Sequence, residues 1–238
     1  MSSLQRQRIE AVEVLRLDRS ERRNAMDSAL LGELLGALEE LAGDETLGAL
    51  IFSTTSERAL CAGADVSEQL DQAGGVARME AFARLYAAVE AFPAPTVAVC
   101  VGNCVGAGAE LAAGCDLRVG GDNLKLAWAG ARMGVPVGPA RLTSLTGLAT
   151  AKDLILTGRT IAMDEAYGLG LLHRTATAAD AETAALKLAR EVAEHAPAGV
   201  RALKGLFREL TDSAAHVARE NVLIVDAQRR GGGLESHH

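Results

Sequence analysis

Apolar and polar positions along the chain follow two periods, and together they predict an α/β protein. Period-two alternation predicts a half-exposed strand over 9–17. Short apolar runs predict further strands over 48–53, 96–101, 116–119 and 124–128. Positions three and four apart predict helices, the first of them capped by Asp27 and carrying a stripe of leucines to about Ala42. The other expected helices cover 66–91, 107–114, 181–195, 198–210 and 213–229. This alternation of strands and helices indicates βα units with largely parallel sheets.

Composition and charge narrow the class of protein. The chain has 238 residues and a net charge of −7, and no basic run interrupts it, so we expect no nucleic-acid partner. No segment reaches the roughly 18 apolar residues of a membrane span, and the polar start does not resemble a signal peptide. We therefore expect a cytoplasmic protein that makes no membrane contact.

The cysteines predict neither a disulfide framework nor a metal site. They form no CxxC pair and have no histidine at metal-ligand spacing. We expect reduced and mostly buried thiols at Cys61, Cys100, Cys104 and Cys115.

The chain divides into a core and a helical end. We expect a core over 1–195, a helical region over 196–230, and a purification-tag remnant over 231–238. No internal repeat or low-complexity linker indicates a further domain.

The most informative stretch runs from Val101 to Leu111 and follows a β-branched segment at 96–100. Small residues at 106–109 allow a ligand to approach the backbone, and the first amides of a helix have no partner inside it. Those amides and the helix dipole favour negative charge. Glu110 follows Ala107 by three positions, so its carboxylate lies on the same helix face as that amide. The pattern indicates an oxyanion site with an acid or base one turn away.

Two phosphate-binding motifs are excluded at this stretch. A dinucleotide fingerprint on Gly106 and Gly108 would need a third glycine where Leu111 stands. The Gly-Lys-Ser/Thr ending of a phosphate loop is absent as well. A glycine-rich turn that serves only tight packing remains the alternative interpretation.

A second segment offers a matching loop. Ala62, Gly63 and Ala64 are small residues ahead of Asp65, which forms a possible capping box with Glu68. A helix should therefore begin near position 66 and leave free amides before it. Two such loops can each donate one hydrogen bond to a carbonyl oxygen, and losing one such donor costs roughly 3–4 kcal/mol of transition-state stabilisation in acyl-transfer enzymes.

At these residues the chain resembles the enoyl-CoA hydratase/isomerase (crotonase) superfamily. The matching segments appear in the family's order over residues from about 10 to 175: Arg23–Met26, Cys61–Asp65, Gly102–Leu117, Leu156–Arg159, Ala162–Ala166 and Gly170–His173. The resemblance implies a spiral of ββα turns, a C-terminal helical trimerisation region, and assembly as a homotrimer or hexamer. It implies an acyl-CoA thioester substrate and no cofactor beyond the coenzyme A carried by that substrate.

The resemblance also assigns roles to single residues. It implies that the amides of Ala64 and Ala107 form the oxyanion hole and that Glu110 is one of two catalytic carboxylates. It places Ala62 beside the adenine and Arg22 and Arg23 near the CoA phosphates. The remaining expected substrate-binding positions are Gly63, Asp65, Gly106 and Gly130.

Two positions depart from the family pattern. Ala107 stands where the family has glycine, and its methyl demands a negative φ or narrows the pocket. Gly130 stands where a standard hydratase carries its second carboxylate, and one missing carboxylate typically removes a factor of about 10²–10⁴. Asp122 and Asp164 are possible substitutes, although a capping or solvated role fits their spacing better. Arg132 is a possible partner for Glu110 or for a substrate carboxylate, with a surface role as the alternative.

Three functions remain open. The first is a hydratase-like lyase in which Glu110 acts as general acid and base. The second is other acyl-CoA enolate chemistry, such as isomerisation, decarboxylation or C–C bond formation. The third is a non-catalytic acyl-CoA binder. Glu110 favours catalysis, whereas Gly130 favours the second and third functions.

Overall fold

The computed structural model of the chain describes residues 2–232 and 234. The strands are β1 (Leu4–Ile9), β2 (Val12–Leu17), β3 (Ala49–Thr54), β4 (Ala59–Cys61), β5 (Thr96–Cys100), β6 (Asn103–Val105), β7 (Leu117–Gly121), β8 (Lys125–Ala127) and β9 (Arg174–Ala176). The helices are α1 (Ser28–Ala42), α2 (Gln72–Ala91), α3 (Ala107–Gly114), α4 (Pro139–Thr146), α5 (Leu148–Thr157), α6 (Met163–Gly168), α7 (Ala181–Ala193), α8 (Pro197–Thr211) and α9 (Ser213–Arg229). Two 3₁₀ turns, η1 (Ser20–Arg22) and η2 (Ala131–Met133), complete the elements.

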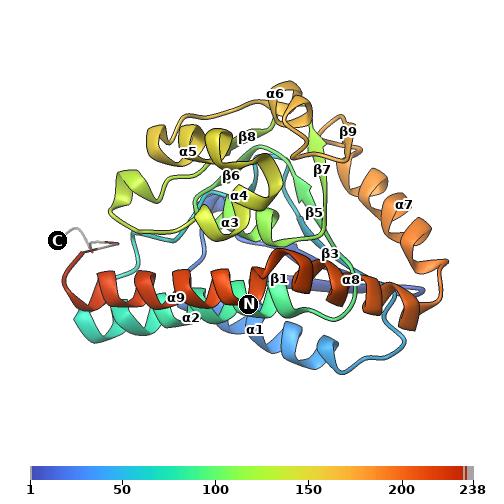
Figure 1. Cartoon of the computed structure of the whole chain (residues 1–238), viewed down its shortest axis with the longest axis horizontal. Coiled ribbons are helices and arrows are strands. Elements are labelled where there is room, and N and C mark those ends of the chain that lie inside the picture. Colours follow the sequence, from blue (N-terminus) through green and yellow to red (C-terminus); the bar gives the residue numbers. More distant parts are fainter. Residues whose placement is uncertain (1, 233, 235–238) are drawn as a thin grey trace.

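The strands form two sheets, and from β3 to β8 successive strands along the chain belong to the larger and the smaller sheet in turn. The larger sheet has the order β1-β2-β3-β5-β7-β9 and the smaller has the order β4-β6-β8. Apart from the antiparallel β1–β2 hairpin, the strand pairs are parallel. Successive turns of chain thus give one strand to each sheet and then a helix, as β3–β4–α2 and β5–β6–α3 do (Figure 1). The expected ββα spiral is confirmed.

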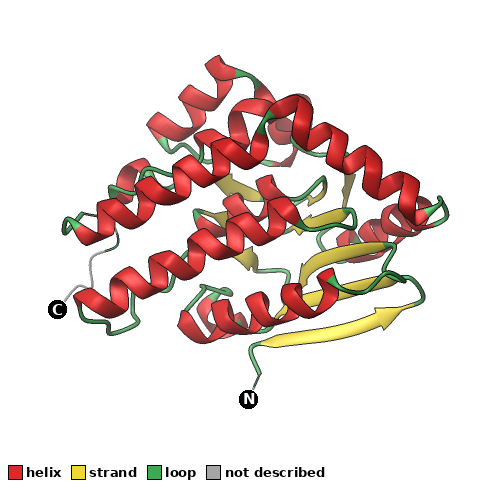
Figure 2. Cartoon of the chain, turned by 60° about the horizontal axis from the view of Figure 1, so that its bottom comes forward, coloured by secondary structure: helices red, strands yellow, loops and turns green. Residues whose placement is uncertain are grey.

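Both faces of the larger sheet are covered by helices (Figure 2). Val12 and Val14 pack on one face with α7, and Leu15 and Leu17 belong to the main core with α1, α2 and α3 on the other. The expectation of a half-exposed strand is therefore wrong, because β2 is buried on both faces. The long helices α2 and α9 lie side by side across the lower part of the molecule in Figure 1.

The first two strands and the second helix differ from the sequence prediction. Residues 9–17 are not one strand, since the chain turns at Glu10 with a φ of +56° and pairs β1 with β2. The predicted helix at 66 begins only at Gln72, because the side chain of Asp71 caps it by accepting from the Gly74 amide at 2.7 Å.

Asp65 and Glu68 make other contacts instead of a capping box. Asp65 accepts hydrogen bonds from the amide and hydroxyl of Ser67, which closes a turn, and Glu68 accepts from the Ser28 amide at the start of α1. The predicted cap at Asp27 is confirmed, since its carboxylate accepts from the Leu30 amide at 2.9 Å.

Three segments that the sequence analysis did not resolve are helices α4, α5 and α6. The C-terminal helices form close to their predicted bounds, and all four cysteines are buried and free, as expected. Within 2–232 and 234, no helix is both long enough and apolar enough to cross a membrane. Positions 233 and 235–238 of the expected tag remnant lie outside the described residues, whereas Leu234 is buried and reaches the cavity described below.

Candidate active site

The turn between β6 and α3 presents an amide at the first helical position. Gly106 is the N-cap with a φ of +52°, a conformation that favours glycine. A Cβ on Gly108 would stand 2.2 Å from the carbonyl oxygen of Cys61, so only glycine allows α3 to approach β4 this closely. The methyl of Ala107 requires a negative φ, and Ala107 is not among the residues with a positive φ. Within the part of the chain that the structure describes, its N–H finds no acceptor.

The loop after β4 presents the second amide. Ala64 forms a parallel bridge with Met26, in which the Met26 amide donates to Gly63 and the Asp65 amide donates to Met26. Because neighbouring amides in an extended segment point to opposite sides, the Ala64 N–H faces away from Met26. No acceptor for it lies among the residues described here.

Buried polar contacts hold this loop in place. Arg19 binds the Asp65 carboxylate at 3.1 Å and the Ala25 carbonyl. The fully buried Asn24 accepts from the Arg19 amide and donates to the Ala59 carbonyl. Asp65 is thus part of the support of the loop and does not line the cavity.

Both loops line one cavity of about 260 Å³. Six of the expected site residues lie on its wall: Ala62, Gly63, Ala64, Gly106, Ala107 and Gly130. The rest of the wall is mostly apolar and comes largely from α2, the loop after η2, and α9: Met79, Phe82, Tyr86, Val135, Val137 and Ile224. A small apolar group can enter here with a carbonyl oxygen directed at two amides.

Glu110, Arg22 and Arg23 do not line this cavity. The two arginines are exposed, in and just after η1, and the Arg23 carbonyl accepts from the Ala62 amide, which places them next to the first loop. Glu110 is only 1% exposed, so it does not point to solvent.

Glu110 forms a buried ion pair that the sequence analysis did not foresee. Its Oε2 accepts from Nε of Arg141 at 2.7 Å, and Arg141 also binds Glu220. Burial, assisted by the charge of Glu220 and opposed by that of Arg141, raises the pKa of Glu110 to about 7. Oε1 accepts no hydrogen bond from the described residues.

The space beside Gly130 is filled. A Cβ at this position would lie 2.7 Å from the Val135 carbonyl oxygen and 2.8 Å from Cγ1 of Val137. The loop after η2 therefore packs where a second carboxylate would enter. Arg132 is exposed, so Arg141 and not Arg132 is the partner of Glu110. Asp122 lies outside the cavity and accepts from the Ala178 amide.

The residues that sequence reasoning missed are Arg141 and Glu220. Glu220 lies between Val217 and Ile224 on the buried face of α9, three residues after the first and four before the second. A charged residue inside an apolar helical stripe was the available signal, because burial of a charge requires a partner.

Comparison with known proteins identifies the family. A sequence profile of the enoyl-CoA hydratase/isomerase family matches residues 7–225. The chain is 34% identical over 211 residues to a Mycobacterium bovis protein named "Probable enoyl-CoA hydratase", covering 87% of this chain and 82% of that one. It is 31% identical over 229 residues to the 2,3-dehydroadipyl-CoA hydratase of Escherichia coli, covering 94% and 89%.

A solved structure shows the same fold. An enoyl-CoA hydratase/isomerase family protein from Hyphomonas neptunium superposes with a TM-score of 0.82 at 29% identity, covering 88% of this chain and 83% of that one. The predicted crotonase fold is confirmed, and the chain belongs to the enoyl-CoA hydratase/isomerase family.

Proposed function

We propose that this protein is a hydratase-like lyase that acts on enoyl-CoA thioesters with one catalytic carboxylate, Glu110. The observation that carries the proposal is the joint position of the Ala64 and Ala107 amides on one apolar cavity, with Glu110 one helical turn beyond Ala107. The amides would hold the thioester oxygen as charge develops on it. The apolar wall favours an uncharged acyl chain.

A single carboxylate can complete hydration in two proton transfers. Ionised Glu110 takes a proton from water as the water oxygen bonds to C3, and the electron pair of the double bond moves to the thioester oxygen. Protonated Glu110 then returns that proton to C2, and the thioester carbonyl re-forms. Water is added across C2 and C3, and the carboxylate ends as it began. A pKa near neutrality suits a group that must both accept and donate.

Double-bond isomerisation is the second candidate, and the packing around Gly130 favours it. Glu110 would remove a proton from C2 of a 3-enoyl thioester and return it to C4, with no need for a second carboxylate or for water. The filled space beside Gly130 supports a reaction that one carboxylate performs alone.

One experiment separates the candidates. Purified protein is incubated with 2-enoyl-CoA and 3-enoyl-CoA esters, and the products are followed by mass spectrometry and by the absorbance of the conjugated thioester. Hydratase activity adds one water to 2-enoyl esters, whereas isomerase activity converts 3-enoyl esters without a change in mass. Bound but unaltered esters would contradict both and leave the acyl-CoA binder.

Introducing the missing carboxylate should not improve hydration. We expect Gly130→Glu to lower stability by about 1–3 kcal/mol, because its Cβ meets the Val135 backbone. We expect no gain in hydratase rate. Urea unfolding and the hydration assay test this. Gly36→Glu, at an exposed helical position with open space for a Cβ, is the matched control. A more active, equally stable Gly130→Glu protein would contradict the proposed packing.

The exposed arginines beside the first loop are proposed to meet the CoA phosphates. We expect Arg22→Ala with Arg23→Ala to weaken CoA binding by about 0.4–2 kcal/mol, roughly two- to thirtyfold, because exposed charge pairs contribute little each. Isothermal calorimetry with CoA measures the loss. The double variant Arg84→Ala with Lys187→Ala removes equal charge elsewhere on the exposed surface and should bind as before.

Association of identical chains is proposed to use α8. Ile224 and Val225 of α9 are buried in the core of their own chain, so they are not available for a contact with another copy. Helix α8 instead exposes four large apolar residues that lie on one helix face: Leu203, Leu206, Phe207 and Leu210. Such a stripe is typical of an interface.

The assembly prediction is tested by light scattering after size-exclusion chromatography. We expect a trimer or hexamer for the unaltered chain and smaller species for Phe207→Glu with Leu210→Glu. Leu156→Glu, an exposed leucine on α5, controls for the added charge. An unchanged mass for the α8 variant would exclude this face.

A further inference from the structure

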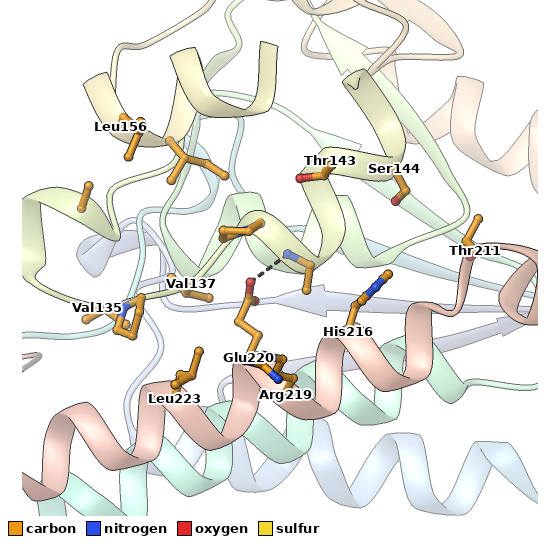
Figure 3. A pocket seen from close by; sticks show the side chains of 15 residues that line it. Val135, Val137, Thr143, Ser144, Leu156, Thr211, His216, Arg219, Glu220 and Leu223 are labelled. Atoms are coloured by element: carbon orange, nitrogen blue, oxygen red, sulfur yellow. Dashed lines mark hydrogen bonds between the residues drawn. The ribbon is translucent and has the colours of Figure 1, made fainter. Parts of the chain in front are cut away.

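The buried guanidinium of Arg141 is shared between two carboxylates from different helices. Arg141 lies on α4 and is 5% exposed, between Glu110 of α3 and Glu220 of α9, which are 1% and 6% exposed. Its Nε donates to Glu110 and its Nη2 donates to Glu220. Figure 3 shows Glu220 reaching from α9 to the start of α4, where its Oε2 also accepts from the Ala140 amide at 2.8 Å.

Nε and Nη2 are the two donors on one edge of a guanidinium that normally bind a single carboxylate side by side. Two other arginines of this chain bind in that way: Arg16 uses both donors on Glu182, and Arg208 uses both on Glu90. At Arg141 the second donor goes to Glu220. Glu110 therefore receives one hydrogen bond where a full pair would give two, and its Oε1 stays unoccupied by the described residues.

Two further buried titratable groups lie beside this pair, whereas Arg219 and His216 of α9 are exposed near Glu220. Tyr86 of α2 lies under Arg141, with the guanidinium carbon 4.6 Å from the ring centroid, and burial raises the pKa of its phenol well above the usual value. Burial also raises the pKa of the nearby Cys61 thiol of β4, to about 12. Both groups are neutral near pH 7. Helix α5 and the segment after β8 contribute the apolar Ile155 and Trp128.

We propose that Glu220 is a positioning residue for Glu110, which draws Arg141 partly away and leaves the Glu110 carboxyl free to exchange a proton. The inference rests on the proposed function of Glu110. It concerns Glu220, which follows Glu110 by 110 positions and lies on the C-terminal helix α9. Without Glu220, both donors of Arg141 become available to Glu110. The carboxylate would then be held in its ionised form and be a weaker base.

The test is the pH dependence of Glu110 in Glu220→Gln, with Asp226→Asn as matched control because it removes one charge from the same helix at a site away from Arg141. The acidic limb of kcat/KM reports the protonation of the free enzyme's base. We expect its midpoint to fall by about one pH unit or more in Glu220→Gln, the effect of removing one nearby charge. Asp226→Asn should leave it in place.

A direct titration keeps the outcome independent of turnover. Carbon-13 NMR of the glutamate carboxyls measures the pKa of Glu110 directly and needs no enzymatic turnover. The Glu110→Gln variant assigns the signal. A lower rate and lower melting temperature with an unmoved midpoint would make Glu220 merely structural and overturn the proposal. Should Glu220→Gln not fold, a Glu110 signal of the unaltered protein that titrates near the ordinary glutamate value of about 4.3 would overturn it as well.

Discussion

Glu110→Gln is expected to lower kcat/KM on any enoyl-CoA ester that the protein converts by about 10²–10⁴-fold, the usual contribution of a positioned acid or base. Glutamine keeps the size of the side chain and can still accept from Arg141, but it cannot carry a proton between water and carbon. Steady-state kinetics on the esters used to identify the reaction would measure the loss. Because glutamine keeps the size of the side chain, binding of the ester, followed by calorimetry, should change little.

The same side chain sets the expected pH dependence of the unaltered protein. Glu110 must start as the ionised base, so activity should fall as pH decreases through its pKa of about 7. In Glu110→Gln this acidic limb should disappear from the residual activity. A variant that kept both its rate and its acidic limb would exclude Glu110 as the proton carrier and favour a binding role for the site.

The loss in Glu110→Gln must be separated from simple unfolding. Arg141 keeps Glu220 as a partner in this variant, so the buried guanidinium is not left without a counter-charge. We therefore expect a folded protein with a lower melting temperature. A rate that falls only in proportion to the folded fraction would show that Glu110 is structural.

Local sequence patterns predicted the parts of this fold that depend on neighbouring residues. Helix α3 begins and ends where small residues and Glu110 indicated, and Asp27 caps α1 through its own side chain. The start of α2 was wrong because Asp65 and Asp71 are both acceptable caps in sequence. Only the three-dimensional contact of Asp65 with Arg19 decides between them.

The electrostatics of the site depend on contacts between residues far apart in the sequence. Arg141 follows Glu110 by 31 positions and Glu220 follows Arg141 by 79. No periodic pattern links such residues, because their meeting depends on how α4 and α9 are packed. Likewise, the sequence shows the absence of a carboxylate at Gly130 but not that the Val135 carbonyl fills the space beside it.

Ala107→Pro is the second change with a large expected effect, a loss of about 10²–10³-fold in kcat, as found when one oxyanion donor is removed. Ala107 is the first residue of α3, where proline is well tolerated because its missing N–H has no partner in the helix. The substitution therefore removes the proposed donor and spares the helical hydrogen bonds. Circular dichroism and thermal unfolding should show a folded protein.

The methyl of Ala107 and the ring of proline both project near the cavity, so sterics must be separated from hydrogen bonding. Ala107→Gly keeps the amide and removes only the methyl, and it should lose far less activity than Ala107→Pro. Difference infrared spectroscopy of a bound enoyl thioester gives a second readout, since donors on the carbonyl oxygen lower its stretching frequency. We expect that shift to weaken in Ala107→Pro and to persist in Glu110→Gln, because the two residues would act on different atoms of the substrate. Equal carbonyl frequencies in Ala107→Pro and the unaltered protein would exclude the Ala107 amide from the oxyanion site.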